Sequence, residues 1–284
     1  MSEQPNQDQE TQQHNPEGKP SGTTAAQRKT RWTASTGGDQ KNNKRSANFV
    51  IQGKGGSGKS VTATLIAQHI KETGEPLVCL DTDQINASFT ATASLGVEQV
   101  DLLNSDNEVD VEIMNACVTR IREEDSHFVV DSGASGFVPL VSYLIDTNLF
   151  TWVAEKKRVV VHVPVVGGAD LGETAHGLSV LISRLPEGVD VVCWKNPFFG
   201  PLTSAAGIPF EETDLYTEDC LPRLAGSVSL PALHPRYAGA AFRKLLVERM
   251  TFADAAATDR FDLITKMWLE AVWGPLKAQI AAVV

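Results

Sequence analysis

The sequence is poor in cysteine and histidine, and neither residue is spaced as a set of metal ligands. Its four cysteines, Cys79, Cys117, Cys193 and Cys220, form no C-x-x-C pair, and its six histidines show no ligand spacing. Zinc sites and disulfide frameworks usually show such spacings. We therefore exclude both classes and interpret the cysteines as reduced thiols in a cytoplasmic protein.

Long apolar runs are also lacking. No stretch approaches the roughly 20 apolar residues that a membrane-spanning helix needs, and the N-terminus is too polar to be a signal peptide. The chain shows no internal repeat. We therefore expect a soluble cytoplasmic protein without membrane insertion.

The composition that is present is that of an ordinary globular protein with one unusual end. Of 284 residues, 42% are hydrophobic, which is enough to build a core, and the net charge is −10. Residues 1–46 differ, because they are polar, hold only one aromatic residue (Trp32) and contain seven basic residues against five acidic ones. We expect a disordered tail over 1–46 and a folded domain over 47–284. The tail would contact nucleic acid or an acidic partner, or simply keep the chain soluble.

After residue 47, short apolar runs alternate with helical patterns. Helices are predicted after the first strand, at 110–124 and, two or three of them, between 237 and 284. Strands are predicted at 48–53, 76–81, 127–131, 158–166, 189–196 and 224–233. Continuous β-branched runs are typical of strands that are buried on both faces. The pattern predicts an α/β fold with a mostly parallel sheet, helices on both faces, and ligands bound beyond the carboxyl ends of the strands.

One short stretch, "GKGGSGKS" at residues 53–60, matches the phosphate-binding loop (P-loop) pattern G-x-x-x-x-G-K-[ST]. It lies between a predicted strand and a predicted helix, as such a loop must. Glycines let backbone N–H groups converge on phosphate oxygens, and the helix N-terminus favours the same negative charge. The pattern thus predicts a P-loop NTPase in which Lys59 neutralises the β- and γ-phosphates and the Ser60 hydroxyl binds Mg²⁺.

Carboxylates follow two other predicted strands. Asp131 ends the 127–131 strand, where a P-loop hydrolase places an acid that holds Mg²⁺. Asp81 and Asp83 end the 76–81 strand, and such a pair can hold a metal-bound water and orient the attacking water. The structural alternatives are a turn or cap at Asp131, and capping of a following helix by Asp83 and Asn86.

The segments "KGGSGKS", "DTDQINASF", "VVDSGASGFVPLVSYLI", "KNPFFGP" and "ERMTFADA" resemble a known family. The loop is similar to the deviant Walker A motif of the ParA/MinD ATPases, and the other segments resemble, within that family, the conjugal-transfer TraL proteins of plasmids. The resemblance covers residues 47–284. It implies a P-loop ATPase that acts in plasmid conjugative transfer, or in plasmid maintenance or partition.

The resemblance also implies residue roles. Lys54 would reach across an ATP-bridged homodimer to the partner's nucleotide, Asp83 would orient the attacking water, and Asp81 and Asp131 would serve the Mg²⁺ shell. Asn196 would read the adenine edge, with Pro231 nearby; an Asn-Pro turn is the alternative for Asn196, and a solvated loop lysine for Lys54. The phosphates would lie against one continuous set of loop residues, Gly55, Gly56, Ser57, Gly58, Lys59, Ser60 and Val61.

Some residues depart from the family pattern. Ser57 replaces a frequent valine, Gln84 stands where many relatives have proline, and "DSGASG" replaces a proline-containing segment after Asp131. The last change affects the loop that senses the γ-phosphate, so we expect slow, partner-stimulated hydrolysis. Two alternatives stay open: a nucleotide-gated scaffold or DNA-binding module that scarcely hydrolyses ATP, and a P-loop kinase for a small molecule.

Three features outside the loop have more than one interpretation. The C-terminal stretch 261–284 is amphipathic, and packing on the core is expected over binding to a membrane surface, because it holds only two basic residues, Lys266 and Lys277. Gly274-Pro275 is expected to kink or split its helix. The aromatic pair in "NPFFGP" would be core or a partner surface. A basic cluster would bind non-specific DNA or form a solvated helix face; its members are Arg236, Arg243, Lys244 and Arg249. A plasmid or transfer-system protein is the other expected partner.

Overall fold

A computed structural model describes residues 44–83, 86–104, 108–133 and 137–284, with only the backbone of residues 137 and 138. The predicted tail lies outside these ranges except for its last three residues. Of these, Ser46 is the first residue of strand β1, and Lys44 and Arg45 contact the folded domain.

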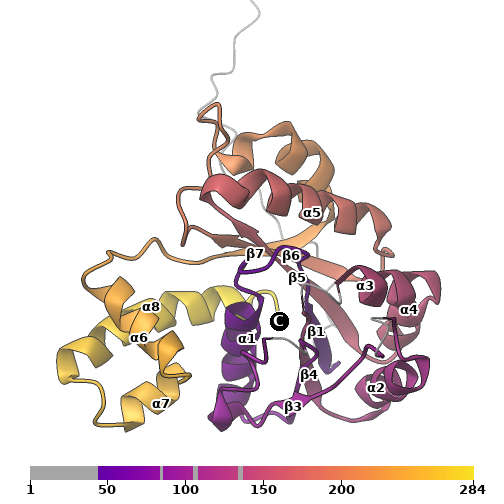
Figure 1. Ribbon diagram of the computed structural model, residues 1–284, viewed down its shortest axis with the longest axis horizontal. Helices are drawn as coiled ribbons and strands as arrows, with labels where there is room; N and C mark the ends of the chain where they lie inside the picture. Colours follow the sequence, from indigo (N-terminus) through magenta and orange to yellow (C-terminus); the bar gives the residue numbers. More distant parts are fainter. Residues whose placement is uncertain (1–43, 84–85, 105–107, 134–136) are drawn as a thin grey trace, which may run out of the picture. The chain divides into compact units, whose positions relative to one another are not determined.

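Seven strands form one sheet in which all paired strands run parallel (Figure 1). Their order across the sheet is β3-β2-β4-β1-β5-β6-β7, so the first strand lies at the centre. Their bounds are β1 (Ser46–Val50), β2 (Leu77–Asp81), β3 (Glu98–Gln99), β4 (His127–Asp131), β5 (Arg158–Val166), β6 (Asp190–Asn196) and β7 (Leu224–Ser229).

Helices follow the strands along the chain and connect them. The α-helices are α1 (Lys59–Thr73), α2 (Val111–Glu123), α3 (Phe137–Asp146), α4 (Leu149–Ala154), α5 (Leu171–Arg184), α6 (Ala238–Val247), α7 (Phe252–Ala257) and α8 (Leu263–Ala281). The short 3-10 and π segments are η3 (Ala93–Leu95), η4 (Gly168–Asp170), η5 (Phe210–Glu212), η6 (Leu215–Cys220) and η7 (Leu221–Arg223).

The sheet has a hydrophobic core on each face, because side chains of a strand alternate between the two sides. On β1, Ala47 and Phe49 pack with α2 to α5, whereas Val50 packs with α1 and α6 to α8 (Figure 1). Both layers are apolar, which explains why the strands read as continuous apolar runs. The predicted fold class, a P-loop NTPase-like α/β fold with a parallel sheet and helices on both faces, is confirmed.

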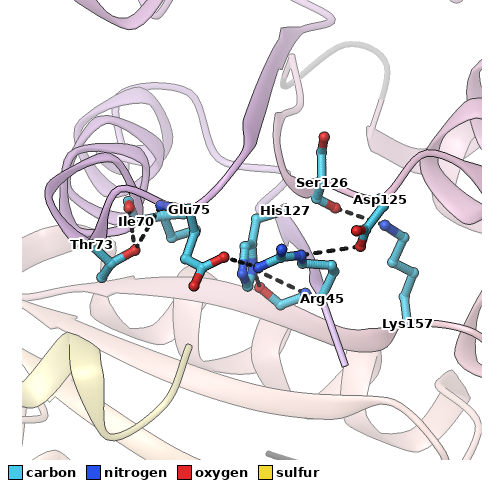
Figure 2. A network of polar contacts seen from close by, with 9 residues as sticks. Arg45, Ile70, Thr73, Glu75, Asp125, Ser126, His127 and Lys157 are labelled. Atoms are coloured by element: carbon cyan, nitrogen blue, oxygen red, sulfur yellow. Dashed lines mark hydrogen bonds and ion pairs between the residues drawn. The ribbon is translucent and has the colours of Figure 1, made fainter. Parts of the chain in front are cut away.

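A polar network ties together the amino-terminal edge of the sheet, opposite the glycine loop (Figure 2). Arg45 forms ion pairs with Glu75 and with Asp125, whose Oδ1 lies 3.2 Å from Nε. The Ser46 amide donates to Nδ1 of His127 at 3.0 Å, and Lys157 Nζ donates to the Ser126 carbonyl at 2.7 Å. These contacts join the starts of β1, β4 and β5.

The C-terminal helix differs from the expectation in one respect. Helix α8 runs without a break through Gly274 and Pro275, so the predicted split is wrong. The carbonyl that Pro275 leaves without its helical donor belongs to Ala271, which is exposed, so water can bind it. The opposite side of α8 packs on the core through Leu269, Val272, Leu276 and Ile280. None of the described helices combines the length and the apolar character needed to cross a membrane.

Candidate functional site

The predicted site residues converge at the carboxyl edge of the sheet because parallel strands bring their ends to one edge. Asp81 at the end of β2 and Val50 at the end of β1 are both in register with Asp131, which ends β4. The glycine loop begins directly beyond β1, and α1 starts at Lys59. The sheet thus places the loop and both strand-ending carboxylates side by side.

The glycines of the loop serve different purposes. Gly56 and Gly58 have φ of 73° and 96°, in the left-handed region that glycine adopts without strain. A Cβ on Gly58 would also lie 3.0 Å from Nδ2 of Asn196. Gly55 has a different role, because a Cβ there would meet nothing within 4 Å. The side of Gly55 on which a Cβ would stand is therefore open space beside the loop.

Lys59 lies folded back over the loop. It is 8% exposed, and its ammonium donates to the carbonyl of Lys54 at 3.2 Å. Burial lowers the pKa of Lys59, while the nearby carboxylates of Asp131 and Asp83 oppose that shift. Within the described residues, the Lys59 ammonium has one hydrogen-bond acceptor, the Lys54 carbonyl. A buried cation with so few acceptors is suited to bind an anionic ligand in the loop.

Asp131 and Ser60 form the most distinctive pair of the site. Asp131 is 1% exposed, and its Oδ1 has no hydrogen-bond partner in the described part of the chain. Burial raises the pKa of Asp131 to about 7; a hydrogen bond from Ser60 acts against this, whereas Asp81 adds to it. A buried carboxylate oxygen without a donor is costly unless a ligand satisfies it.

Asp81 and Asp83 organise the loop after β2. Both oxygens of the fully buried Asp81 accept hydrogen bonds: Oδ1 from the Asp83 amide, and Oδ2 from the amide and hydroxyl of Thr90, all at 3.0 Å. Asp83 Oδ1 accepts from the Asn86 amide at 3.0 Å. No helix begins at Asn86, so the structural alternative, in which Asp83 and Asn86 cap a following helix, does not occur there. Gly133 allows close approach, since its Cβ would lie 3.1 Å from Cγ of Asp83.

Lys54 points to acids of its own chain. Its Nζ lies 3.1 Å from Oδ1 of Asp170 and 2.8 Å from Oε2 of Glu173. The hydrogen bond with Glu173, followed by that with Asp170, raises the pKa of Lys54. In the described part of the chain, Lys54 is therefore partly exposed and paired with two acids of its own protomer.

Asn196 ends β6 and supports the loop. Its Nδ2 donates to the Ser57 carbonyl at 3.2 Å, and its Oδ1 accepts from the Phe198 amide at 3.1 Å. Beside it is a cavity of about 460 Å³, bounded by the segments 196–200 and 230–235 and by α6. Pro231 and the exposed rings of Phe198 and Phe199 line this cavity. The phenylalanines are thus surface residues rather than core.

The structure brings Lys54, Lys59, Ser60, Asp81, Asp83, Asp131 and Asn196 to one end of the sheet; Gln84 and residues 134–136 lie outside the described residues. Sequence reasoning missed Thr90, Asp170 and Glu173, because their contacts depend on the tertiary fold and no local motif marks them.

No group of three or more His, Cys, Asp or Glu side chains in the described ranges is placed to hold a metal ion.

Two relatives from Escherichia coli, each named protein TraL, are 34% identical to the chain. The alignments span 233 and 235 residues, 82% of this chain in both cases, and 95% and 96% of the relatives. No protein-family model matches.

Two solved structures from Borrelia burgdorferi show weaker similarity. A putative plasmid partition protein bound to AMPPNP has a TM-score of 0.44 at 13% identity, over 84% of this chain and 98% of that chain. A second plasmid partition protein has a TM-score of 0.38 at 12% identity, over 72% of this chain and 96% of that one.

Proposed function

The chain belongs to the TraL family, and from this premise and the geometry of its P-loop we propose that it is an ATPase whose nucleotide controls dimerisation. ATP would bind at residues 53–60, two protomers would associate around the bound nucleotides, and slow hydrolysis to ADP and phosphate would separate them. The process served would be plasmid conjugative transfer, or plasmid maintenance or partition.

The observation that carries the proposal is the Ser60–Asp131 pair at the mouth of a glycine loop. A hydroxyl and a buried carboxylate with one unpartnered oxygen supply hard oxygen ligands, the kind of metal ligand that Mg²⁺ prefers. Mg²⁺ in nucleotide sites usually takes only one or two protein ligands, with phosphate and water oxygens completing the shell. The residues present therefore fit Mg²⁺ bound with a nucleotide, although they form no all-protein metal cluster.

The chain's own residues would then divide the work. Mg²⁺, when bound, would supply charge neutralisation between phosphate oxygens. Lys59 would leave the carbonyl of Lys54 for the β- and γ-phosphates, and the open side of Gly55 would admit those phosphates. Asp83 would orient water for direct attack on the γ-phosphate, with no covalent enzyme intermediate. Asp81, whose oxygens already accept three hydrogen bonds, would contact the metal shell through water.

The base would occupy the cavity beside Asn196. Its lining combines aromatic rings, prolines and backbone groups, which suits a flat heterocycle. Asn196 would both support the loop carbonyl of Ser57 and face the adenine edge after a small rearrangement of its amide. The aromatic pair Phe198–Phe199, with ring centroids 4.9 Å apart, would cover the base from the solvent side.

The first test is ATP turnover compared with Lys59→Ala. We expect the wild type to release phosphate slowly, with or without added DNA, and the variant to show neither turnover nor binding of a fluorescent ATP analogue. Turnover no higher than that of the Lys59→Ala control would contradict the enzyme assignment. Transfer of phosphate to a metabolite by a monomer would instead support the kinase alternative.

One observation favours the second candidate, a nucleotide-gated module that scarcely hydrolyses ATP. Asp83 Oδ1 already accepts a backbone amide, and Gly133 stands against the same carboxylate, so its freedom to orient water is restricted. Such a module would bind ATP and dimerise yet release no phosphate. Measuring nucleotide binding and phosphate release on the same sample separates the two candidates.

The dimer is tested by molar mass in solution without nucleotide, with ADP, and with a non-hydrolysable ATP analogue. We expect doubling of the mass only with the analogue, and no doubling in Lys54→Ala, because that lysine would stabilise phosphate charge in trans. A mass that nucleotide leaves unchanged, with the analogue still bound, would refute the dimerisation switch while retaining the P-loop assignment.

A further inference from the structure

Lys54 is held by two carboxylates that none of the roles assigned above involves. Asp170 ends the short turn η4, and Glu173 lies in the first turn of α5, so the two acids present neighbouring oxygens to one ammonium. The distances are 3.1 Å to Asp170 Oδ1 and 2.8 Å to Glu173 Oε2. All three side chains are partly exposed, at 31%, 39% and 62%, so another ligand has access to the ammonium.

The turn that carries these acids is fixed by close backbone packing. The amide of Gly167 donates to the Asn196 carbonyl at 2.9 Å, and that of Gly168 donates to the Pro201 carbonyl at 3.1 Å. A Cβ on Gly167 would lie only 2.1 Å from the Gly200 carbonyl oxygen. The segment before the acids is therefore pressed against the loop that follows β6, which fixes the backbone from which both carboxylates extend.

The same contacts lead back to the P-loop. Asn196, whose carbonyl accepts from Gly167, donates through Nδ2 to the Ser57 carbonyl at 3.2 Å. Lys59 in turn donates to the Lys54 carbonyl. Lys54, its two acids, Asn196 and the loop thus form a closed ring of contacts within one protomer. A change at the phosphate end, such as movement of Lys59 toward a nucleotide, acts on the backbone of Lys54 directly.

We propose that Asp170 and Glu173 are positioning residues that retain Lys54 within its own protomer and set the nucleotide concentration at which it transfers to the partner's phosphates. The inference rests on the proposed dimerisation switch, and it identifies Asp170 and Glu173 as the residues that oppose the transfer of Lys54 to the partner. Two carboxylates and a nucleotide phosphate are alternative anions for a single ammonium, so dimer formation must break the intramolecular ion pairs.

The expected shift in the nucleotide concentration for dimerisation follows from the solvent exposure of the two ion pairs of Lys54. Solvent-exposed ion pairs are each worth little, so neutralising both acids is expected to lower the analogue concentration for half-maximal dimerisation by about three- to tenfold. Salt screens exposed charges, so the difference between wild type and variant should shrink as ionic strength rises.

The experiment measures that midpoint by light scattering at fixed protein concentration, in a titration with a non-hydrolysable ATP analogue. The variants are Asp170→Asn, Glu173→Gln and the double variant, each of which keeps the size and polarity of its side chain. Glu187→Gln is the matched control, because it removes one exposed negative charge in the turn that follows the C-terminal end of α5. We expect intermediate shifts for the single variants, the full shift for the double variant, and none for Glu187→Gln.

A second measurement tests whether the acids act through Lys54 or directly repel the nucleotide. Binding of a fluorescent ATP analogue is measured on dilute Lys54→Ala protein, with and without Asp170→Asn and Glu173→Gln. The proposal predicts equal affinities, because the acids then have no lysine to hold. Tighter binding after neutralisation would overturn it in favour of simple charge repulsion.

The remaining outcomes also decide the matter. Unshifted midpoints in a wild type that does dimerise, or an equal shift in Glu187→Gln, would overturn the proposal and leave the dimerisation switch intact. If only the double variant dimerised, the proposal would be supported, and the two acids would restrain Lys54 more strongly than expected. Absence of dimers in every variant would refute the switch itself, and the restraint with it.

Discussion

At the scale of single residues, His162 in the middle of β5 is a buried titratable group that the sequence did not mark. Its Nδ1 accepts from the Trp194 indole at 3.0 Å, and its Nε2 lies 3.1 Å from Oδ1 of Asn48. This pattern requires a neutral ring that donates through Nε2. The residue pairs with Val50 in the sheet, so the network lies directly beneath the start of the P-loop.

The contribution of His162 to stability should therefore fall on acidification. Burial lowers the pKa of His162 to about 3, well below the ordinary histidine value of 6.5. Between these values His162 binds a proton in the unfolded chain but not in the folded chain, so its contribution to the free energy of unfolding falls as the pH falls from about 6.5 toward 3, by up to about 1.4 kcal/mol per pH unit. Urea unfolding of wild type and His162→Gln from pH 7 to pH 4 checks this. Asp131, whose raised pKa favours the fold on acidification, is present in both proteins, so the difference between them isolates His162. We expect the variant to be less stable at pH 7 and to lose less stability than the wild type as the pH falls; equal slopes would contradict the assignment.

Two glycines of the P-loop offer a matched pair of substitutions. Gly58→Ala should cost about 1–2 kcal/mol of unfolding free energy, because it forces alanine into the left-handed region and against Asn196. Gly55→Ala should leave stability unchanged, because its new methyl group meets no protein atom. Both should weaken binding of a fluorescent ATP analogue, the latter by occupying space needed by phosphate. Unchanged affinity in Gly55→Ala would show that the phosphates lie elsewhere.

At the scale of elements, helix α8 is tied to the helix that leaves the P-loop. The indole of Trp273 donates to Oε1 of Glu72 in α1 at 3.0 Å, and Lys277 lies 2.7 Å from the same carboxylate. The indole also stacks on Phe252 of α7, with centroids 5.0 Å apart. One carboxylate therefore connects the C-terminal helix to α1, and one aromatic contact connects it to α7.

This connection between α8 and α1 predicts that different substitutions of Trp273 lower the free energy of unfolding by different amounts. Trp273→Phe keeps most of the stacking and loses one hydrogen bond, so it should cost about 1 kcal/mol of unfolding free energy. Trp273→Ala removes a large buried side chain and should cost about 3–5 kcal/mol. Chemical denaturation of both variants measures the difference. Equal losses in the two variants would show that the hydrogen bond, rather than the packing, holds α8 in place.

The elements were predicted well where their pattern is local. Strands buried on both faces are visible as apolar runs, and the P-loop is visible because glycine, lysine and serine must occupy fixed positions. Of the two outcomes expected at Pro275, the split was wrong, because whether a proline breaks a helix depends on what surrounds the freed carbonyl, here solvent. The two-residue strand β3 and the acids Asp170 and Glu173 could not be predicted, since each is defined only by a partner distant in sequence.

At the scale of the whole molecule, the start of the folded domain can be tested by truncation. Removing residues 1–43 should leave the unfolding midpoint and nucleotide binding unchanged, because the contacts of Figure 2 begin at Arg45. Removing 1–46 should destabilise the protein by about 2–4 kcal/mol, since it deletes the Arg45 ion pairs and the hydrogen bonds of Ser46. Thermal unfolding of the two truncations decides this; similar midpoints would mean that these contacts contribute little.

The position of β1 at the centre of the sheet also has a consequence for biosynthesis. Its neighbours are β4 and β5, and the pair Ser46 and Arg158 joins residues separated by 112 positions. At about 5–20 residues per second, a ribosome needs roughly 6–22 s to add the second neighbour, β5, and until then at least one edge of the apolar strand β1 is unpaired. The nucleotide site is thus completed late on the ribosome, and we expect the nascent chain to depend on chaperones until residue 166 has emerged.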